Sequence, residues 1–557
     1  MFVQNPAHHL TKQETPVTRT SPAGTPLGDD FHLFDTTLRD GAQRAGISYS
    51  ATDKLAVARL LDSVGVGFIE GGWPGALPTD TEFFARAAAG ELELAHAALV
   101  AFGSTRKAGV DVREDLQVKA LLDSRAPVVT LVAKSDRRHI ERALRTDVDE
   151  ACAMVRDTVR YLADNGRRVF LDAEHFFDGY AYDPDCALRV LQSAVDGGAD
   201  VVVLCDTNGG QLPGGLGQTV TEVVARTGFR VGIHCQDDTA CAVANSIAAV
   251  QAGATHVQCT ANGYGERAGN ADLFAVTANL VTKLGMPVLP TEKLAELSRV
   301  SHAIAEIANI APNAHQAYVG QSAFAHKAGL HASAIKVDPL LYNHIDPAIV
   351  GNDMRVLVTE MAGRASLELK GRELGIDLAG RPDVLTTVTN RVKELESTGW
   401  SFEAADASLE LLLRAELGDE SQVDAPFTLE SYRVILDHRA DGVVMSEATV
   451  KVIIDGERVI ATAEGNGPVH ALDAALRQAL RPHLPWTDSV SLADYKVRIL
   501  TNSHGTDAVT RVLIESTDGE AEWTTVGVHG NIVEASWLAM CDGLAYKAMR
   551  RSSLVSS

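Results

Sequence analysis

The segment GIHCQDDTA, residues 232–240, places two potential metal ligands two residues apart on an expected strand. His234 and Gln236 share one face of that strand, because alternate side chains of a strand point to the same side. An imidazole nitrogen and an amide oxygen can both bind a cation. Cys235 points to the opposite face and is not expected to be a ligand. The alternative is a buried histidine that is hydrogen-bonded to a neighbouring glutamine.

Other polar residues with complementary chemistry follow other apolar runs. Arg39 and Asp40 lie in DTTLRDG, where the carboxylate can bind a hard cation and the guanidinium can stabilise an oxyanion. The alternative for this pair is a surface salt bridge. The proposed metal ligands are one nitrogen and three oxygens, which favour Mg²⁺ or Mn²⁺ and leave Zn²⁺ possible; they come from Asp40, His234, Gln236 and Asn270.

Three more side chains at the ends of apolar runs could act on a substrate. Glu174 is a candidate general base or orienting group. Thr207 could hydrogen-bond a substrate carboxylate, and Glu70 could hold Arg39 in place. Each of them could instead cap the helix that follows, which is a common role of polar residues at strand ends.

Eight apolar runs, each followed by a helical pattern, must position these residues. Over about 250 residues this alternation predicts a (β/α)8 TIM barrel, for which we expect the bounds 30–290. A doubly wound open sheet is the alternative. In a closed barrel the first, seventh and eighth strands are neighbours, so the four proposed ligands can surround one point. The expected strands are 31–35, 66–72, 98–103, 128–133, 168–174, 201–207, 230–236 and 255–261.

The rest of the chain has a different character. Residues 1–29 are rich in Pro, Thr and Ser, lack the apolar core of a secretory signal, and are expected to be a disordered extension. Residues 291–426 have helical patterns and are expected to form linker subdomains. Residues 427–557 are expected to form an α+β domain with an internal repeat, because 448–480 resembles 510–544.

Composition excludes some classes of function. The chain has 557 residues, with 50 basic and 73 acidic side chains and a net charge of −23, which argues against a nucleic-acid-binding surface. Its seven cysteines include no C-x-x-C pair and are expected to be reduced thiols of a cytoplasmic protein. No apolar run reaches the roughly 20 residues that cross a membrane.

Together the motifs resemble those of the acyl-CoA-condensing metalloenzymes, the family of the 2-isopropylmalate, homocitrate and citramalate synthases. The resemblance covers residues 31–547 and is greatest to the long citramalate synthases. The motifs that carry it are DTTLRDGAQ, EGGWPG, AFGSTR, DAEHFFDGY, CDTNGG, NGYGERAGN, APNAHQAYVG, SAFAHKAGLHASAI and AEGNGPV.

The resemblance implies a Claisen-type condensation of acetyl-CoA with pyruvate to (R)-citramalate and CoA, in isoleucine biosynthesis. A divalent metal would bind the 2-oxo acid, and Arg39 would stabilise its ketone oxygen as this becomes an alkoxide. His326 and Tyr342, from the helical subdomain, can come from a partner subunit, which implies a homodimer. His326 and Glu174 would share the role of base. The other matching residues are Asp40, Thr207, His234 and Asn270.

The sequence departs from the family pattern in the segment GIHCQDDTA, residues 232–240. Gln236 replaces the usual second histidine ligand, and Asp237 replaces the usual asparagine, so the identity of the metal stays open. The C-terminal domain resembles an amino-acid sensor, for which isoleucine is the expected effector; a dimerisation module that senses nothing is the alternative. The alternative functions are a synthase for another 2-oxo acid, a carbon–carbon lyase on the same barrel and a catalytically inactive sensor.

Overall fold

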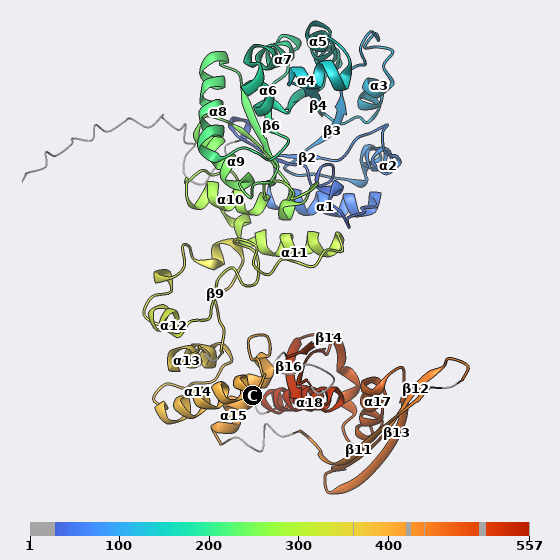
Figure 1. Cartoon of the computed structure of the whole chain (residues 1–557), viewed down its shortest axis with the longest axis vertical. Coiled ribbons are helices and arrows are strands. Elements are labelled where there is room, and N and C mark those ends of the chain that lie inside the picture. Colours follow the sequence, from blue (N-terminus) through green and yellow to red (C-terminus); the bar gives the residue numbers. More distant parts are fainter. Residues whose placement is uncertain (1–27, 360, 419–424, 439, 501–507, 556–557) are drawn as a thin grey trace, which may run out of the picture. The chain divides into compact units, whose positions relative to one another are not determined.

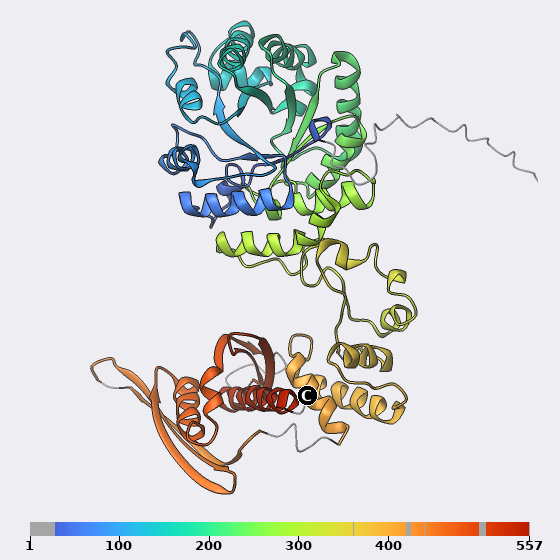
Figure 2. The same cartoon turned by 180° about the vertical axis from the view of Figure 1, so that it is seen from behind.

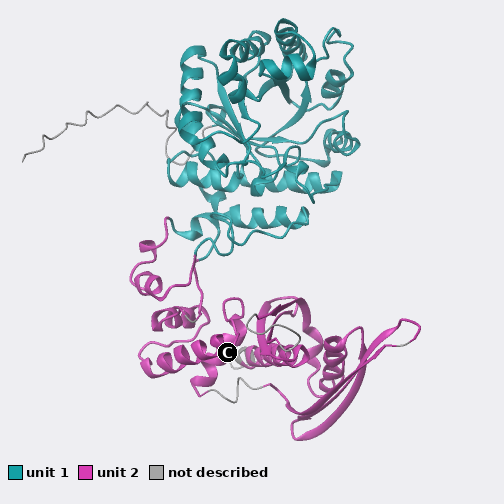
Figure 3. Cartoon of the chain, in the orientation of Figure 1, with its two compact units in different colours: residues 1–324, 345–353 teal, residues 325–344, 354–557 magenta. Residues whose placement is uncertain are grey.

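The computed structural model describes residues 28–359, 361–418, 425–438, 440–500 and 508–555. The chain divides into two compact units, shown in different colours in Figure 3. Unit 1 comprises residues 1–324 and 345–353, and unit 2 comprises residues 325–344 and 354–557. In the described part of the chain, no helix combines the length and the hydropathy that crossing a membrane requires.

Unit 1 is built around a closed barrel of eight parallel strands, which confirms the predicted (β/α)8 fold (Figure 1). The last strand pairs with the first, with His256 opposite His32, so the open-sheet alternative is wrong. Each strand lies within or beside an apolar run that the sequence indicated. The strands are β1 (His32–Asp35), β2 (Phe68–Glu70), β3 (Ala98–Ser104), β4 (Val128–Lys134), β5 (Arg168–Glu174), β6 (Val201–Asp206), β7 (Val231–Cys235) and β8 (His256–Cys259).

Helices surround the barrel, as the views from opposite sides show (Figures 1 and 2). Ser50 caps α1 in a capping box with Asp53, and Gly65 ends this helix in a left-handed conformation. The helices of unit 1 are α1 (Ala51–Val64), α2 (Pro78–Arg86), α3 (Leu116–Asp123), α4 (Arg137–His139), α5 (Val148–Asp164), α6 (Phe176–Tyr182), α7 (Pro184–Gly197), α8 (Pro213–Thr227), α9 (Ala242–Gln251), α10 (Leu273–Thr282) and α11 (Leu297–Ile307).

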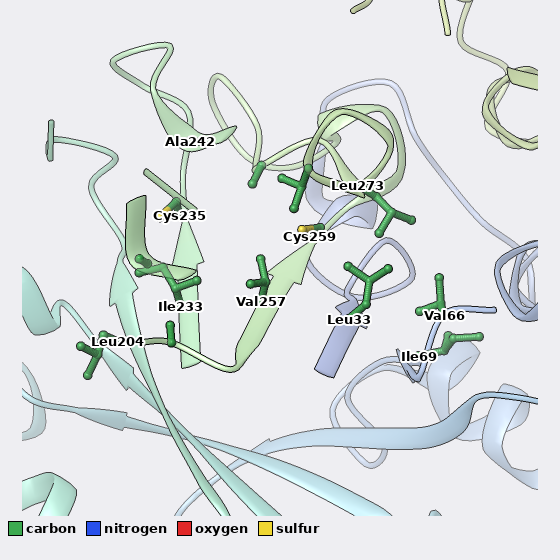
Figure 4. Close-up of a cluster of buried hydrophobic side chains, with 14 of the residues drawn as sticks. Leu33, Val66, Ile69, Leu204, Ile233, Cys235, Ala242, Val257, Cys259 and Leu273 are labelled. Atoms are coloured by element: carbon green, nitrogen blue, oxygen red, sulfur yellow. The ribbon is translucent and has the colours of Figure 1, made fainter. Parts of the chain in front are cut away.

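Because successive side chains of a strand point to opposite faces, the barrel has two separate apolar clusters, one outside and one inside. Outward-facing residues such as Ile233, Cys235 and Val257 belong to the core that includes the helices, part of which is drawn in Figure 4. Inward-facing Phe34 and Phe170 belong to a separate buried cluster that draws residues from six of the barrel strands, β1 to β6. Packing fills this part of the barrel interior, which leaves the polar ends of the strands as the place for a site.

Both expected bounds of the barrel region need correction. Gly28 and Asp29 are not part of a disordered extension, because Gly28–Asp30 is a 3₁₀ turn and Asp29 forms an ion pair of 2.8 Å with Arg168; residues 1–27 lie outside the described residues. At the other end, α11 belongs to unit 1 rather than to a linker that begins at 291. Ser301 of α11 donates to Asn262 at 2.6 Å and thereby ties the helix to the loop after β8.

Unit 2 begins with short helices and ends in the expected repeat. Each repeat consists of three antiparallel strands and a helix, so the sequence comparison missed the first strand of each, β11 and β14. The elements of unit 2 are β9 (Ala325–His326), α12 (Gly329–Ile335), β10 (Arg355–Val356), α13 (Arg364–Glu373), α14 (Pro382–Ser397), α15 (Asp406–Glu416), β11 (Thr428–His438), β12 (Val444–Ile454), β13 (Glu457–Gly465), α17 (Pro468–Leu480), β14 (Ser491–Ile499), β15 (Thr510–Thr517), β16 (Glu522–His529) and α18 (Ile532–Val555).

Candidate active site

A cavity of about 640 Å³ opens at the carboxyl ends of the barrel strands. This is the position that the strand-end motifs predict, since chemistry on this fold gathers at that face. Most of the predicted barrel residues contribute to its wall. The lining includes Arg39, Asp40, Asp172, Glu174, Thr207, His234 and Gln236.

The four proposed metal ligands come together at the base of this cavity. Asp40 Oδ2 lies 3.4 Å from His234 Nε2 and accepts a hydrogen bond of 3.0 Å from Gln236 Nε2. Asn270 pairs with Gln236 through an isolated β-bridge, and its side chain interacts with the Asp40 carboxylate. All four residues are buried. Three segments that are distant in sequence therefore meet at one point, as a closed barrel requires.

Charges near Asp40 shift its pKa and that of His234 in opposite directions. Burial alone would raise the pKa of Asp40, but Arg39 and then His234 outweigh it, so this carboxyl titrates well below its usual range. Burial alone would lower the pKa of His234, whereas its hydrogen bond with Asp40 raises it. Asp40 is therefore an anion that is held among cationic or donor groups.

Two buried amide oxygens in this cluster, Gln236 Oε1 and Asn270 Oδ1, have no hydrogen-bond partner among the described residues. The amide nitrogen of Asn270 donates to the Tyr264 carbonyl at 3.0 Å, so its oxygen remains available. Within the described residues, no group of three or more His, Cys, Asp or Glu side chains could hold a metal. Orphaned oxygens beside one carboxylate and one imidazole form a donor set that fits a hard divalent cation.

A buried chain of hydrogen bonds orients His234 from behind. Nδ1 of His234 donates to Gln258 Oε1 at 2.8 Å, and Gln258 Nε2 donates to Asp172 Oδ1 at 2.8 Å. Because an amide oxygen only accepts, the Nδ1 atom of His234 carries a proton, and Nε2 faces the Asp40 carboxylate. Burial and then the charge of Glu70 raise the pKa of Asp172 to about 7.

Gln258 was not among the residues predicted from the sequence, although the pattern of its strand contains a signal for it. Gln258 lies two residues after His256 and two before Thr260, so these three polar side chains share one face, which is the barrel interior. Its partner His234 lies directly opposite it in the β7–β8 register.

Arg39 is held on three sides. Its Nε donates to Glu70 Oε2 at 2.6 Å, which is the contact that the sequence analysis expected. Thr36 Oγ1 donates to the same oxygen at 2.7 Å. The guanidinium carbon lies 3.9 Å from the centre of the Phe102 ring, and NH1 lies 3.4 Å from Asp40 Oδ1. This packing presents a fixed positive charge beside the proposed metal position.

Glu174 and Thr207 lie on the other side of the cavity. Glu174 forms an ion pair with Lys134, a residue that the sequence analysis did not single out and that lies opposite it in the β4–β5 register. Thr207 Oγ1 accepts the backbone N–H of His175 at 2.8 Å. Because the Thr207 oxygen already accepts, its own hydrogen is available for a ligand in the cavity.

The two remaining predicted residues belong to unit 2. His326 lies in β9 and its Nε2 is 2.9 Å from Asn343 Oδ1. Tyr342 stacks on His331, with ring centroids 4.1 Å apart, and is about 41% exposed. Their contribution to the barrel site stays a prediction.

Unit 2 has a second cavity, of about 320 Å³, between its two repeats. It begins just after the glycine loop that ends at Gly467, where Val469 and His470 of α17 line it. Most of its exposed wall is apolar, and the polar side chains that line it are His470, Asp473, Arg477, Tyr495 and Ser516. A small ligand with an apolar side chain fits this chemistry.

Three families match consecutive parts of the chain. The HMGL-like family matches residues 30–304, which contain the barrel. The homocitrate synthase post-HMGL domain-like family matches residues 318–399. The LeuA allosteric (dimerisation) domain matches residues 403–548, which include both repeats.

Relatives match over nearly the whole length. An (R)-citramalate synthase of Streptomyces coelicolor is 62% identical over 95% of this chain and 98% of its own length. An (R)-citramalate synthase of Aquifex aeolicus is 46% identical over 94% of this chain and 99% of its own length. A 2-isopropylmalate synthase of Methanocaldococcus jannaschii is 30% identical over 96% and 98%. With this barrel, this strand-end site and these relatives, the chain belongs to the (R)-citramalate synthase family of HMGL-like barrel proteins.

Proposed function

We propose that this protein condenses acetyl-CoA with pyruvate and hydrolyses the thioester, which yields (R)-citramalate and CoA. The observation that carries the proposal is the 62% identity to an (R)-citramalate synthase over nearly the whole of both chains. The cavity supports it, because Arg39 can neutralise an oxyanion on one side, where the Asp40 cluster would hold a cation, while Thr207 offers a hydroxyl on the other.

The reaction requires a base and a stabilised oxyanion. A base removes a proton from the methyl group of acetyl-CoA, and the resulting carbanion attacks the ketone carbon of pyruvate. Arg39 stabilises the alkoxide that forms on the ketone oxygen, because Glu70 and Phe102 hold the guanidinium in one orientation. Water then cleaves the thioester, which releases CoA and makes the overall reaction irreversible.

Glu174 and His326 are the groups that we assign to proton transfer. The Glu174 carboxylate lines the cavity beside the Lys134 ammonium, which can orient it and return a proton. His326 belongs to unit 2, and its role depends on that unit, from the same or a partner chain, reaching the cavity. Tyr342 would contribute from the same segment.

Asp40, His234, Gln236 and Asn270 would hold the divalent cation. When bound, the cation supplies positive charge that polarises the ketone of the 2-oxo acid. A half-turn of the Gln236 amide exchanges its nitrogen and oxygen, which would direct the oxygen toward Asp40. This set of three oxygens and one nitrogen favours Mn²⁺ or Mg²⁺ over Zn²⁺.

The test is a CoA-release assay on the full chain with acetyl-CoA and several 2-oxo acids, each with Mn²⁺, Mg²⁺ or Zn²⁺. We expect the fastest turnover with pyruvate. Fastest turnover with 2-oxoisovalerate or 2-oxoglutarate would instead indicate a 2-isopropylmalate or homocitrate synthase. No turnover with any acceptor and metal, together with amino-acid binding, would indicate an inactive sensor.

We further propose that the cavity of unit 2 binds isoleucine and that the protein acts as a homodimer. The apolar wall suits a branched side chain, and the domain matches an allosteric dimerisation family. Leu492→Trp should fill the cavity and abolish calorimetric binding of isoleucine. Ile499→Trp, on the same strand but outside the cavity wall, should bind normally. Equal binding by both variants would place the effector elsewhere.

A further inference from the structure

A buried lysine and aspartate contact the loop that carries Arg39 and the residue that follows Glu70 at the end of β2. Lys54 of α1 and Asp80 of α2 are each about 3% exposed. The Lys54 ammonium donates to the carbonyl of Leu38 at 2.8 Å, to the carbonyl of Gly71 at 3.0 Å, and to Asp80 Oδ1. An ammonium has three N–H donors, so each of them has an acceptor.

The two carbonyls are adjacent to the proposed catalytic pair. Leu38 directly precedes Arg39, and Gly71 directly follows Glu70. The parallel ladder between β1 and β2 ends at Asp35 and Ile69, so the sheet no longer holds the two backbones together where they carry these side chains. Lys54 connects them beyond the end of the ladder.

Asp80 links Lys54 to Phe102, the second side chain that holds Arg39. Its second oxygen accepts the backbone N–H of Trp73 at 2.7 Å. The Trp73 ring packs edge-on against Phe102, with ring centroids 5.1 Å apart. Phe102 in turn lies under the Arg39 guanidinium. The Lys54–Asp80 pair is therefore linked to both side chains that hold Arg39, to Glu70 through Gly71 and to Phe102 through Trp73.

Stability alone gives a weak reason for this pair. A buried ion pair must repay a large cost of desolvation, and an apolar replacement of similar volume is often neutral or stabilising. We infer that Lys54 and Asp80 are positioning residues, which hold the loops after β1 and β2 so that Arg39 presents its guanidinium to the developing alkoxide. The kinetic part of this inference rests on the proposed function.

The inference predicts a particular kinetic change. In Lys54→Met the two loops lose their connection, and a small displacement of Arg39 should lower kcat roughly tenfold to a hundredfold. The KM for acetyl-CoA should change little, because Arg39 acts on charge that appears only in the transition state. Asp80→Asn should have the same kind of effect, because its amide has one oxygen where the carboxylate has two. In one orientation the amide N–H groups face the Trp73 N–H, and in the other they face the Lys54 ammonium, so one of the two contacts is lost.

The matched control is Asp62→Asn. Asp62 is also a buried charged residue of α1, but its carboxylate accepts the N–H groups of Ala95, His96 and Ala97 before β3, far along the helix from Lys54. We expect this variant to lose thermal stability and to keep its kcat. Thermal denaturation followed by circular dichroism would show that each variant is folded at the assay temperature.

A second readout does not depend on turnover. Arginine-specific modification by phenylglyoxal, with peptide mass spectrometry at Arg39, should be faster in Lys54→Met and Asp80→Asn than in the wild type or Asp62→Asn. If the wild type turns over no 2-oxo acid, the proposed function fails, and the modification rates still test the positioning. Wild-type kcat and wild-type modification rates in folded Lys54→Met and Asp80→Asn would overturn the inference. Equal loss of kcat in Asp62→Asn would overturn it as well.

Discussion

Replacing Gln258 by leucine tests whether the buried chain behind His234 controls metal binding. Leucine has a similar volume but removes both hydrogen bonds, so His234 Nδ1–H and the Asp172 carboxyl each lose a partner. A buried polar group without a partner costs about 1–3 kcal/mol. Loss of a group that orients a metal ligand typically lowers metal affinity about 10- to 100-fold. Since a tenfold change in affinity is about 1.4 kcal/mol, this loss corresponds to roughly 1.4–2.8 kcal/mol of binding free energy.

The assay is a calorimetric Mn²⁺ titration of metal-stripped protein, with kcat measured at saturating Mn²⁺. We expect a weaker Mn²⁺ affinity in Gln258→Leu and a partial recovery of kcat at high Mn²⁺. The control is Asn245→Leu, which removes another buried amide, on α9, whose side chain donates to the Gln211 carbonyl at 2.9 Å. An unchanged Mn²⁺ affinity in folded Gln258→Leu would refute the reasoning.

Three further predictions concern other parts of the molecule. Burial raises the pKa of Asp35 to about 7, so the folded chain keeps a proton that the unfolded chain releases above its usual pKa of 3.8, and stability should fall as pH rises between these values. Asp35→Asn should therefore show a smaller difference in Tm between pH 5 and pH 8 than the wild type; an equal difference would contradict this. Gln236→His should shift the preferred metal toward Zn²⁺ in the CoA-release assay, and an unchanged metal profile would show that Gln236 is not a ligand. Gly527→Ala should destabilise unit 2 by roughly 1–3 kcal/mol in chemical denaturation, because its Cβ would lie 2.0 Å from the backbone oxygen of Ala535; no loss would mean that the helix moves away freely.

Much of the barrel and of its site could be predicted from local pattern. The apolar runs are as long as buried strands, and the helical patterns between them leave few ways to bury both kinds of surface. The period of two along β7 assigns Ile233 and Cys235 to the outer core and His234 to the interior. Asp40, His234 and Asn270 could be expected at one point, because strand ends converge in a closed barrel.

The sequence by itself thus determined the fold class, the repeat in unit 2 and the face that carries the site, since these depend on periodicity and on the order of elements. Apart from the expected contact of Arg39 with Glu70, only the tertiary structure decided which side chains in the site are partners. Gln258 lies opposite His234, and Lys134 opposite Glu174, because of the register between neighbouring strands. Lys54 reaches two loops at once because α1 packs over both. Register and packing arise from closure of the whole barrel, and no local run of residues encodes them.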